Sequence, residues 1–180
     1  MVTMKRSTKL FLFGIGVALG LSTREILKQL NKATQAVGPY VFERLGKDAS
    51  VGELTAELEA AGKRNLQQLM EKMPTERNYR LLVHLIGIEK WGQRRLRVTL
   101  GDPVISDEHD AYCPPFGLSW NELQDIFNQT RLETLDLARF IEEAGVSGTR
   151  IFHNEFGKIT ASHWLNYLRL HANLELWKMN

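Results

Sequence analysis

The sequence predicts an all-α protein: a four-helix bundle with an additional N-terminal helical segment. Apolar residues recur three or four positions apart in four stretches after residue 50, which is the spacing of one helix face. A residue that can cap a helix stands before each stretch. Four such helices bury their apolar faces against one another, and 180 residues are enough for one core of this kind with an extension.

The first two bundle helices are bounded by clear start and stop signals. Ser50 and Glu53 have the spacing of a capping box, and the helix that they begin reaches a break at Pro74. Thr75 can cap the second helix, which continues until the Gly-Asp-Pro sequence at 101–103.

The second half of the bundle begins with a long loop. Residues 101–118 are rich in turn-forming and acidic residues, and ordered loops of this length tend to be functional. A second capping box begins at Ser119 and opens a third helix that ends at Gly145. A short extended stretch is expected over 149–156, before a last helix capped by Thr160.

The N-terminal part of the chain has two segments. Residues 1–22 contain an apolar run, 10–21, behind three basic residues. This run is shorter than a membrane span, and the alternatives are a packed helix, an uncleaved signal or a membrane tether. Residues 23–49 are expected to form an amphipathic lead-in helix, and residues 50–180 are expected to form the bundle.

The composition indicates the class of protein and limits the partners that it can bind. Hydrophobic residues make up 43% and charged residues 24% of the chain, as in globular proteins and not in disordered or polytopic membrane proteins. The formal net charge of +2 argues against nucleic acid as a partner. The lone cysteine, Cys113, cannot form an internal disulfide, which agrees with a cytoplasmic location. Membrane association through residues 10–21 is the alternative.

Three residues form a candidate metal site. His84 lies on the apolar face of the second helix, where its ring nitrogens need either a hydrogen-bond partner or a metal. His171 and Glu175 lie one turn apart on the last helix and project from the same face. Two imidazoles and a carboxylate suit a divalent transition metal, with zinc, nickel, iron and manganese all open.

Four segments carry a family resemblance. They are 79–89 (YRLLVHLIGIE), 101–103 (GDP), 120–123 (WNEL) and 156–160 (FGKIT), the last of them ahead of the helix that contains His171. In order and spacing they resemble the DinB/YfiT-like superfamily, and the likeness extends roughly from Ser50 to the C-terminus. The resemblance implies a DinB-like four-helix bundle with His84 as a metal ligand. The family's last helix typically supplies two more histidines, which fall on His171 and on position 175. Because residue 175 is Glu175 here, it either ligates as an anion or marks a lost site.

The resemblance also implies a class of activity. The family includes metal-dependent hydrolases and thiol S-transferases that use low-molecular-weight thiols. A metal held by His84, His171 and Glu175 would then lower the pKa of a bound water or thiol and so produce the nucleophile that attacks a small-molecule substrate. The rival hypothesis is a metal-free bundle that acts as a binding or membrane-associated scaffold. Exposed aromatic residues on the helices suit a homodimer.

The remaining histidines have simpler interpretations. His163 lies two turns before His171, too far along the helix for both to bind one ion. His109 either binds a metal or covers the cleft, but a solvated position in its acidic loop is the preferred interpretation. His153 either approaches the cleft or, as preferred, hydrogen-bonds only to the backbone.

Other polar and aromatic residues are expected to be structural. Glu89 suits a salt bridge or a supporting role, and Cys113 has no base beside it in the sequence, so neither is proposed as a ligand or nucleophile. Arg94, Arg95 and Arg97 either hold an anionic substrate or, as preferred, are solvated. Core or interface packing is expected for five aromatic residues: Trp91, Trp120, Trp164, Tyr167 and Trp177.

Overall fold

The computed structural model describes residues 49–180. Four long helices account for most of them: α3 (Val51–Met70), α4 (Glu76–Leu96), α5 (Trp120–Glu143) and α6 (Ala161–Trp177). Two short 3-10 helices, η1 (Arg97–Leu100) and η2 (His109–Tyr112), lie between α4 and α5, and a hairpin of β1 (Arg150–His153) and β2 (Gly157–Thr160) joins α5 to α6. The predicted mainly helical class is therefore confirmed.

Two predictions concern the N-terminal part of the chain: the segment 1–22 with its apolar run 10–21, and the lead-in helix over 23–49. Both lie outside the described residues, except for residue 49 at the end of the second segment. Of the helices that the structure does describe, none has the length and apolar character needed to cross a membrane.

The predicted caps begin the helices. The side chains of Ser50 and Ser119 accept hydrogen bonds from the backbone N–H groups of Glu53 and Glu122. Both glutamates accept in return from the backbone N–H of their serine, so two complete capping boxes are present. The other two helices begin at threonine caps, as predicted: Thr75 and Thr160. Local signals thus fix where each helix starts.

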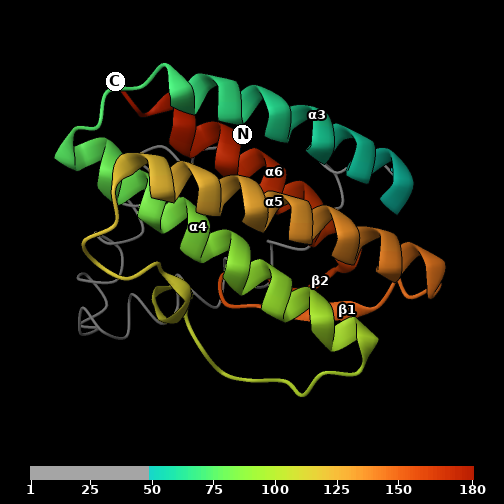
Figure 1. The fold of residues 1–180 in the computed structure, drawn as a ribbon. Coiled ribbons are helices and arrows are strands. Elements are labelled where there is room, and N and C mark those ends of the chain that lie inside the picture. The colour runs from blue at the N-terminus through green and yellow to red at the C-terminus, as the bar shows by residue number, and fades with distance from the viewer. Residues whose placement is uncertain (1–48) are drawn as a thin grey trace, which may run out of the picture.

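The direction of the helices explains the long loop. In Figure 1, α3 and α6 run one way along the bundle, and α4 and α5 run the other way. Each of α3 and α4 contacts both α5 and α6. Because α4 and α5 point in the same direction, the chain between them must return along the length of the bundle, and segment 97–119 does so.

The hairpin corrects the all-α prediction. The expected extended stretch is right for β1, but the chain then turns at residues 154–156, and β2 was not predicted. Gly157 has a φ of +71°, which glycine adopts without strain, and it pairs with His153 beside the turn. Ile151 and Ile159 stand opposite each other in the hairpin and are both buried against the core. The hairpin therefore adds to the apolar core beside α6.

The core consists of two apolar clusters and a set of buried polar groups. One cluster includes Trp91 and Trp164, whose rings lie 5.1 Å apart, and the other includes Phe127. Four polar residues with side chains inside the bundle, which we call the polar layer, are Glu89, Gln93, Arg131 and Thr134. They are joined to one another by hydrogen bonds and one ion pair.

The polar layer confirms the salt-bridge role of Glu89. Arg131 Nη2 lies 2.8 Å from Glu89 Oε2, and the hydroxyl of Thr134 donates to Glu89 Oε1 at 2.8 Å. Gln93 Nε2 donates to the Thr134 hydroxyl oxygen at 3.0 Å. A Cβ at Gly62 would lie 2.9 Å from Arg131 Cγ, so glycine lets α3 pass close to this buried side chain.

Candidate metal centre

Three side chains predicted as ligands meet between two helices. His84 comes from α4, and His171 and Glu175 come from α6, which packs against α4. One ligand atom from each side chain lies within 4.8 Å of the other two. We call these three residues the candidate metal centre.

The candidate metal centre is largely shielded from water. The side chains of His171 and Glu175 are 15% and 7% exposed, and His84 is half-buried. Burial lowers the pKa of His171 to about 4, although the negative charge of Glu175 opposes this shift. Burial also lowers the pKa of His84, and neighbouring His109 adds to the effect. Both imidazoles are therefore neutral at neutral pH, which is the form that binds metals.

A cation from the protein already contacts the carboxylate. Lys178 Nζ lies 2.5 Å from Glu175 Oε1, and the same oxygen lies 3.7 Å from His171 Nε2. A bound metal would share this carboxylate with Lys178 or use its other oxygen. The ammonium thus reduces the attraction of the centre for a second cation.

The donor set fits a divalent transition metal. Imidazole nitrogens and carboxylate oxygens bind zinc at about 2.0–2.2 Å, so ligand atoms around one ion lie roughly 3–4 Å apart. Spacings within 4.8 Å require side-chain adjustments on the order of 1 Å and no movement of the helices. Three protein ligands leave coordination positions for water or substrate. Zinc, nickel, iron and manganese all accept such ligands.

His109 lies beside the centre, which corrects its preferred interpretation as a solvated residue. Its side chain is 28% exposed, and its ring centroid is 4.8 Å from that of His84. The two rings meet nearly at right angles, at 84°. The long loop therefore places a third imidazole, that of His109, next to the candidate metal centre.

Asp107 anchors the loop that carries His109. Its carboxylate lies 2.7 Å from Arg95 Nη2 and accepts hydrogen bonds from Trp91 Nε1 at 3.2 Å and from the Tyr112 hydroxyl at 2.5 Å. Arg95 is only 3% exposed and also donates to the backbone of Ile105, so its predicted solvated position is wrong.

The neighbouring arginines differ from Arg95. Arg94 pairs with Asp102 at 3.2 Å and donates to the carbonyl of Pro103, so it also holds the loop and is not simply solvated. Arg97 is exposed, as predicted. Two of the three arginines, Arg94 and Arg95, thus bind residues of the loop, because the loop begins at the end of α4 and folds back over it.

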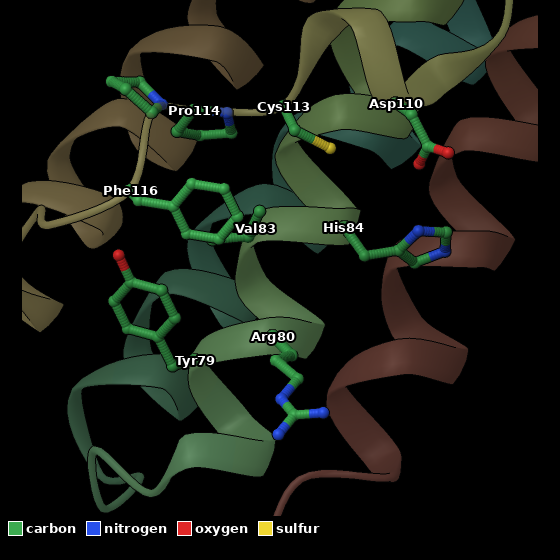
Figure 2. A pocket seen from close by; sticks show the side chains of 9 residues that line it. Tyr79, Arg80, Val83, His84, Asp110, Cys113, Pro114 and Phe116 are labelled. Atoms are coloured by element: carbon green, nitrogen blue, oxygen red, sulfur yellow. The ribbon is translucent and has the colours of Figure 1, made fainter.

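A pocket opens next to His84. Its volume is about 560 Å³, in the range of small-molecule sites, and its walls are mainly apolar. Figure 2 shows the His84 ring and the Asp110 carboxylate on one side of the pocket, with Phe116 and Tyr79 on the other. Nine residues line it: Tyr79, Arg80, Val83, His84, Asp110, Cys113, Pro114, Pro115 and Phe116.

Cys113 lines this pocket as a protonated thiol. Burial raises its pKa, and the negative charge of Asp110 adds to the shift. The thiolate is the nucleophilic form of cysteine. We therefore do not propose Cys113 as a nucleophile.

The other two histidines lie outside the centre. His163 Nδ1 is 2.5 Å from the hydroxyl of Thr160 at the start of α6. His153 is 2% exposed, and its Nδ1 accepts hydrogen bonds from the backbone N–H groups of Glu155 and Phe156. The predicted hydrogen bonding of His153 to the backbone is confirmed, and neither histidine belongs to the group of His84, His171 and Glu175.

Sequence reasoning missed Lys178 and Asp107. Lys178 follows Glu175 by three positions, a spacing that brings side chains together on a helix and was available as a signal. Asp107 gave no such signal, because two of its partners, Trp91 and Arg95, lie on α4 and precede it by more than ten residues.

Comparison with protein-family models, with curated proteins and with solved structures gives no match to this chain. The likeness to the DinB/YfiT-like superfamily therefore stays a resemblance in sequence. The geometry of the candidate metal centre and its pocket carries the functional argument.

Proposed function

We propose that this protein is a DinB-like, metal-dependent enzyme of the hydrolase or thiol S-transferase type. The observation that carries the proposal is the convergence of His84, His171 and Glu175 at a shielded position beside a pocket of about 560 Å³. A cluster of ligands without a pocket would suit a purely structural metal, and a pocket without ligands would suit a binding protein.

The side chains of the centre have distinct roles in this proposal. His84 and His171 are neutral donors because burial lowers the pKa of each ring. Glu175 supplies a negative charge to the same position. A divalent metal bound there would lower the pKa of a water or thiol ligand and so generate the nucleophile near neutral pH.

The pocket sets the kind of substrate. Its walls include Val83, Pro114 and Phe116, which favour an apolar group, and Phe116 is fully exposed at 100%. Arg80 supplies a positive charge at the wall, although Glu76 pairs with it. We therefore propose a small molecule with an apolar body, and an anionic group on it would contact Arg80.

One observation favours the alternative of a metal-free bundle that acts as a scaffold. Lys178 already pairs with Glu175 at 2.5 Å, so the carboxylate has a counter-charge without a metal. The two functions differ in a simple measurable property, the metal content.

Elemental analysis of the purified full chain tests the proposal. We expect about one transition metal ion per chain, retained through dialysis, and its loss in His84→Ala. His163→Ala is the matched control, because this histidine is on α6 but outside the centre, and it should retain the metal. A metal-free wild-type protein that also fails to take up added zinc or nickel would support the scaffold.

The role of Glu175 is tested separately. Glu175→Gln keeps the shape of the side chain but removes its charge, and we expect metal affinity to fall by about tenfold or more. Glu175→His, which replaces the anion with a third neutral imidazole, is expected to bind metal more tightly. Unchanged affinity in both variants, measured by calorimetric titration, would exclude Glu175 as a ligand.

A further inference from the structure

We propose that His109 is an additional ligand of the candidate metal centre, so that the complete set is three histidines and one carboxylate. This inference rests on the proposed function, because it requires a metal at His84. It assigns a binding role to the long loop between α4 and α5.

The spacing of the imidazole rings fits a shared ion. A metal lies about 2.0–2.1 Å from a coordinating ring nitrogen, which places it roughly 3.2 Å from the ring centroid. Two rings on one ion then have centroids about 4.5 Å apart for a right angle at the metal and about 5.2 Å apart for a tetrahedral angle. The observed separations are 4.8 Å for His84–His109 and 5.3 Å for His84–His171. The ring separations of both His84 pairs therefore fall in the range that a shared ion produces.

Packing against α4 holds His109 in this place. A Cβ at Gly87 would lie 2.7 Å from Cys113 Sγ and 3.1 Å from the backbone oxygen of His109. Only glycine lets η2 lie this close to the helix, and Gly87 follows His84 by three residues, about one turn. On the other side, Asp107 fixes the loop through Arg95. Contacts on both sides of η2, at Gly87 and at Asp107, therefore hold His109 close to His84.

Asp110 contacts one nitrogen of the His109 ring. Its Oδ1 lies 3.1 Å from His109 Nε2. A carboxylate next to one ring nitrogen favours the proton on that nitrogen and leaves the lone pair on the other, Nδ1, for a metal. Carboxylate–histidine pairs of this kind commonly orient metal ligands.

A fourth ligand restricts the choice of metal. Four protein ligands complete a tetrahedral zinc site and leave it closed, as in structural zinc sites. A six-coordinate ion such as nickel, iron or manganese keeps two positions for water and substrate. With His109 bound, the centre is therefore suited to a six-coordinate metal if it is catalytic.

Titration of the full chain with cobalt(II) and with nickel(II) tests the assignment without any substrate. We expect His109→Ala to bind both ions at least tenfold more weakly than the wild type, and to change the d–d absorption spectrum of bound cobalt. Gly87→Ala, which displaces η2 but keeps His109, should weaken binding in the same direction. His163→Ala is the control and should match the wild type.

X-ray absorption of the nickel-loaded protein supplies a second measurement, because it counts imidazole rings around the metal. Three rings in the wild type and two in His109→Ala support the assignment. Wild-type affinity and an unchanged spectrum in His109→Ala, with binding lost in His84→Ala, would overturn this inference and leave the proposed function intact. Failure of the wild type to bind either ion would overturn both.

Discussion

The bundle contains two groups of polar side chains in its interior, and they differ in charge balance and in access. In the polar layer, the carboxylate of Glu89 is matched by the guanidinium of Arg131 and the hydroxyl of Thr134. All are at most 3% exposed. In the candidate metal centre, a carboxylate is gathered with neutral imidazoles, and the centre borders a pocket at His84.

The difference shows how a buried polar group can be assigned to structure or to function. Burial raises the pKa of Glu89, while the charge of Arg131 and the hydrogen bond from Thr134 oppose the shift, so the layer supplies its own counter-charge. The centre gathers atoms that accept rather than donate, and it draws its counter-charge from the half-exposed Lys178. A cluster with an excess of acceptors is suited to a cation from outside.

The largest effect is expected from unpairing the polar layer. Glu89→Leu leaves the guanidinium of Arg131 buried without its partner, and the free energy of unfolding should fall by about 3–5 kcal/mol. Urea denaturation measures this loss. The double variant Glu89→Leu, Arg131→Met removes both charges and should recover much of it.

Asp136→Asn is the control for this prediction. Asp136 pairs with Arg139 on the surface, with side chains 65% and 52% exposed, so the change should be within about 0.5 kcal/mol. A loss below about 1 kcal/mol in Glu89→Leu would contradict the structural role of the layer.

The candidate metal centre should respond in the opposite way. His171→Leu replaces a largely buried imidazole by an apolar side chain of similar size, and we expect the metal-free protein to keep its stability within about 1 kcal/mol or to gain some. The wild type should gain about 2.7 kcal/mol from metal at 100 times its Kd, and the variant should gain nothing. Thermal unfolding with and without nickel measures both effects. Equal metal-induced stabilisation in the two proteins would remove His171 from the ligand set.

Protonation of the buried histidine His153 should make the stability of the protein depend on pH. Burial lowers the pKa of His153 to about 3, and the charge of Arg95 adds to this shift. Below pH 6.5, the ordinary pKa of histidine, His153 is protonated in the unfolded chain. In the folded protein it stays neutral until about pH 3. Stability should therefore fall with decreasing pH across this window, by about 1.4 kcal/mol per pH unit from His153.

His153→Asn tests the pH dependence. The asparagine oxygen can still accept from the turn backbone, but the side chain does not titrate, so the slope of unfolding free energy between pH 6 and pH 4.5 should decrease. The slope is the readout, whatever the change in absolute stability. Parallel curves for the two proteins would show that His153 does not cause the dependence.

The smallest expected effect comes from Lys178. Lys178→Ala removes the cation that competes for Glu175, and metal affinity should rise by about threefold to tenfold, because the lysine is 39% exposed and partly screened. Competition titration against a chelator of known affinity measures the change. Lys63→Ala, at an exposed surface pair, should have no effect. A fall in affinity on Lys178→Ala would mean that the ammonium orients Glu175 rather than competing with the metal.

The sequence predicted those features that depend on neighbouring residues. Ser50 and Ser119 cap helices through residues three positions away, so their signals are local. His171 and Glu175 share a helix face, and their proximity follows from helical spacing. His84 was predicted as a metal ligand from its place on the apolar face of α4, together with the family resemblance.

Features that depend on the path of the loop were not predictable. The return of segment 97–119 along the bundle brings Asp107 to Arg95 and His109 to His84. This path follows from α4 and α5 running in the same direction, which no local pattern specifies. Strand β2 was missed for a similar reason, since its short sequence forms a strand only by pairing with β1.

The most direct test of the central claim, that one metal ion is held by His84, His171 and Glu175, is anomalous diffraction from crystals of the full chain grown with nickel. Data collected on both sides of the nickel absorption edge should give one strong peak between these three side chains, within about 2.0–2.3 Å of each ligand atom. A peak at another position, or density for Lys178 alone against Glu175 in nickel-saturated crystals, would contradict the claim.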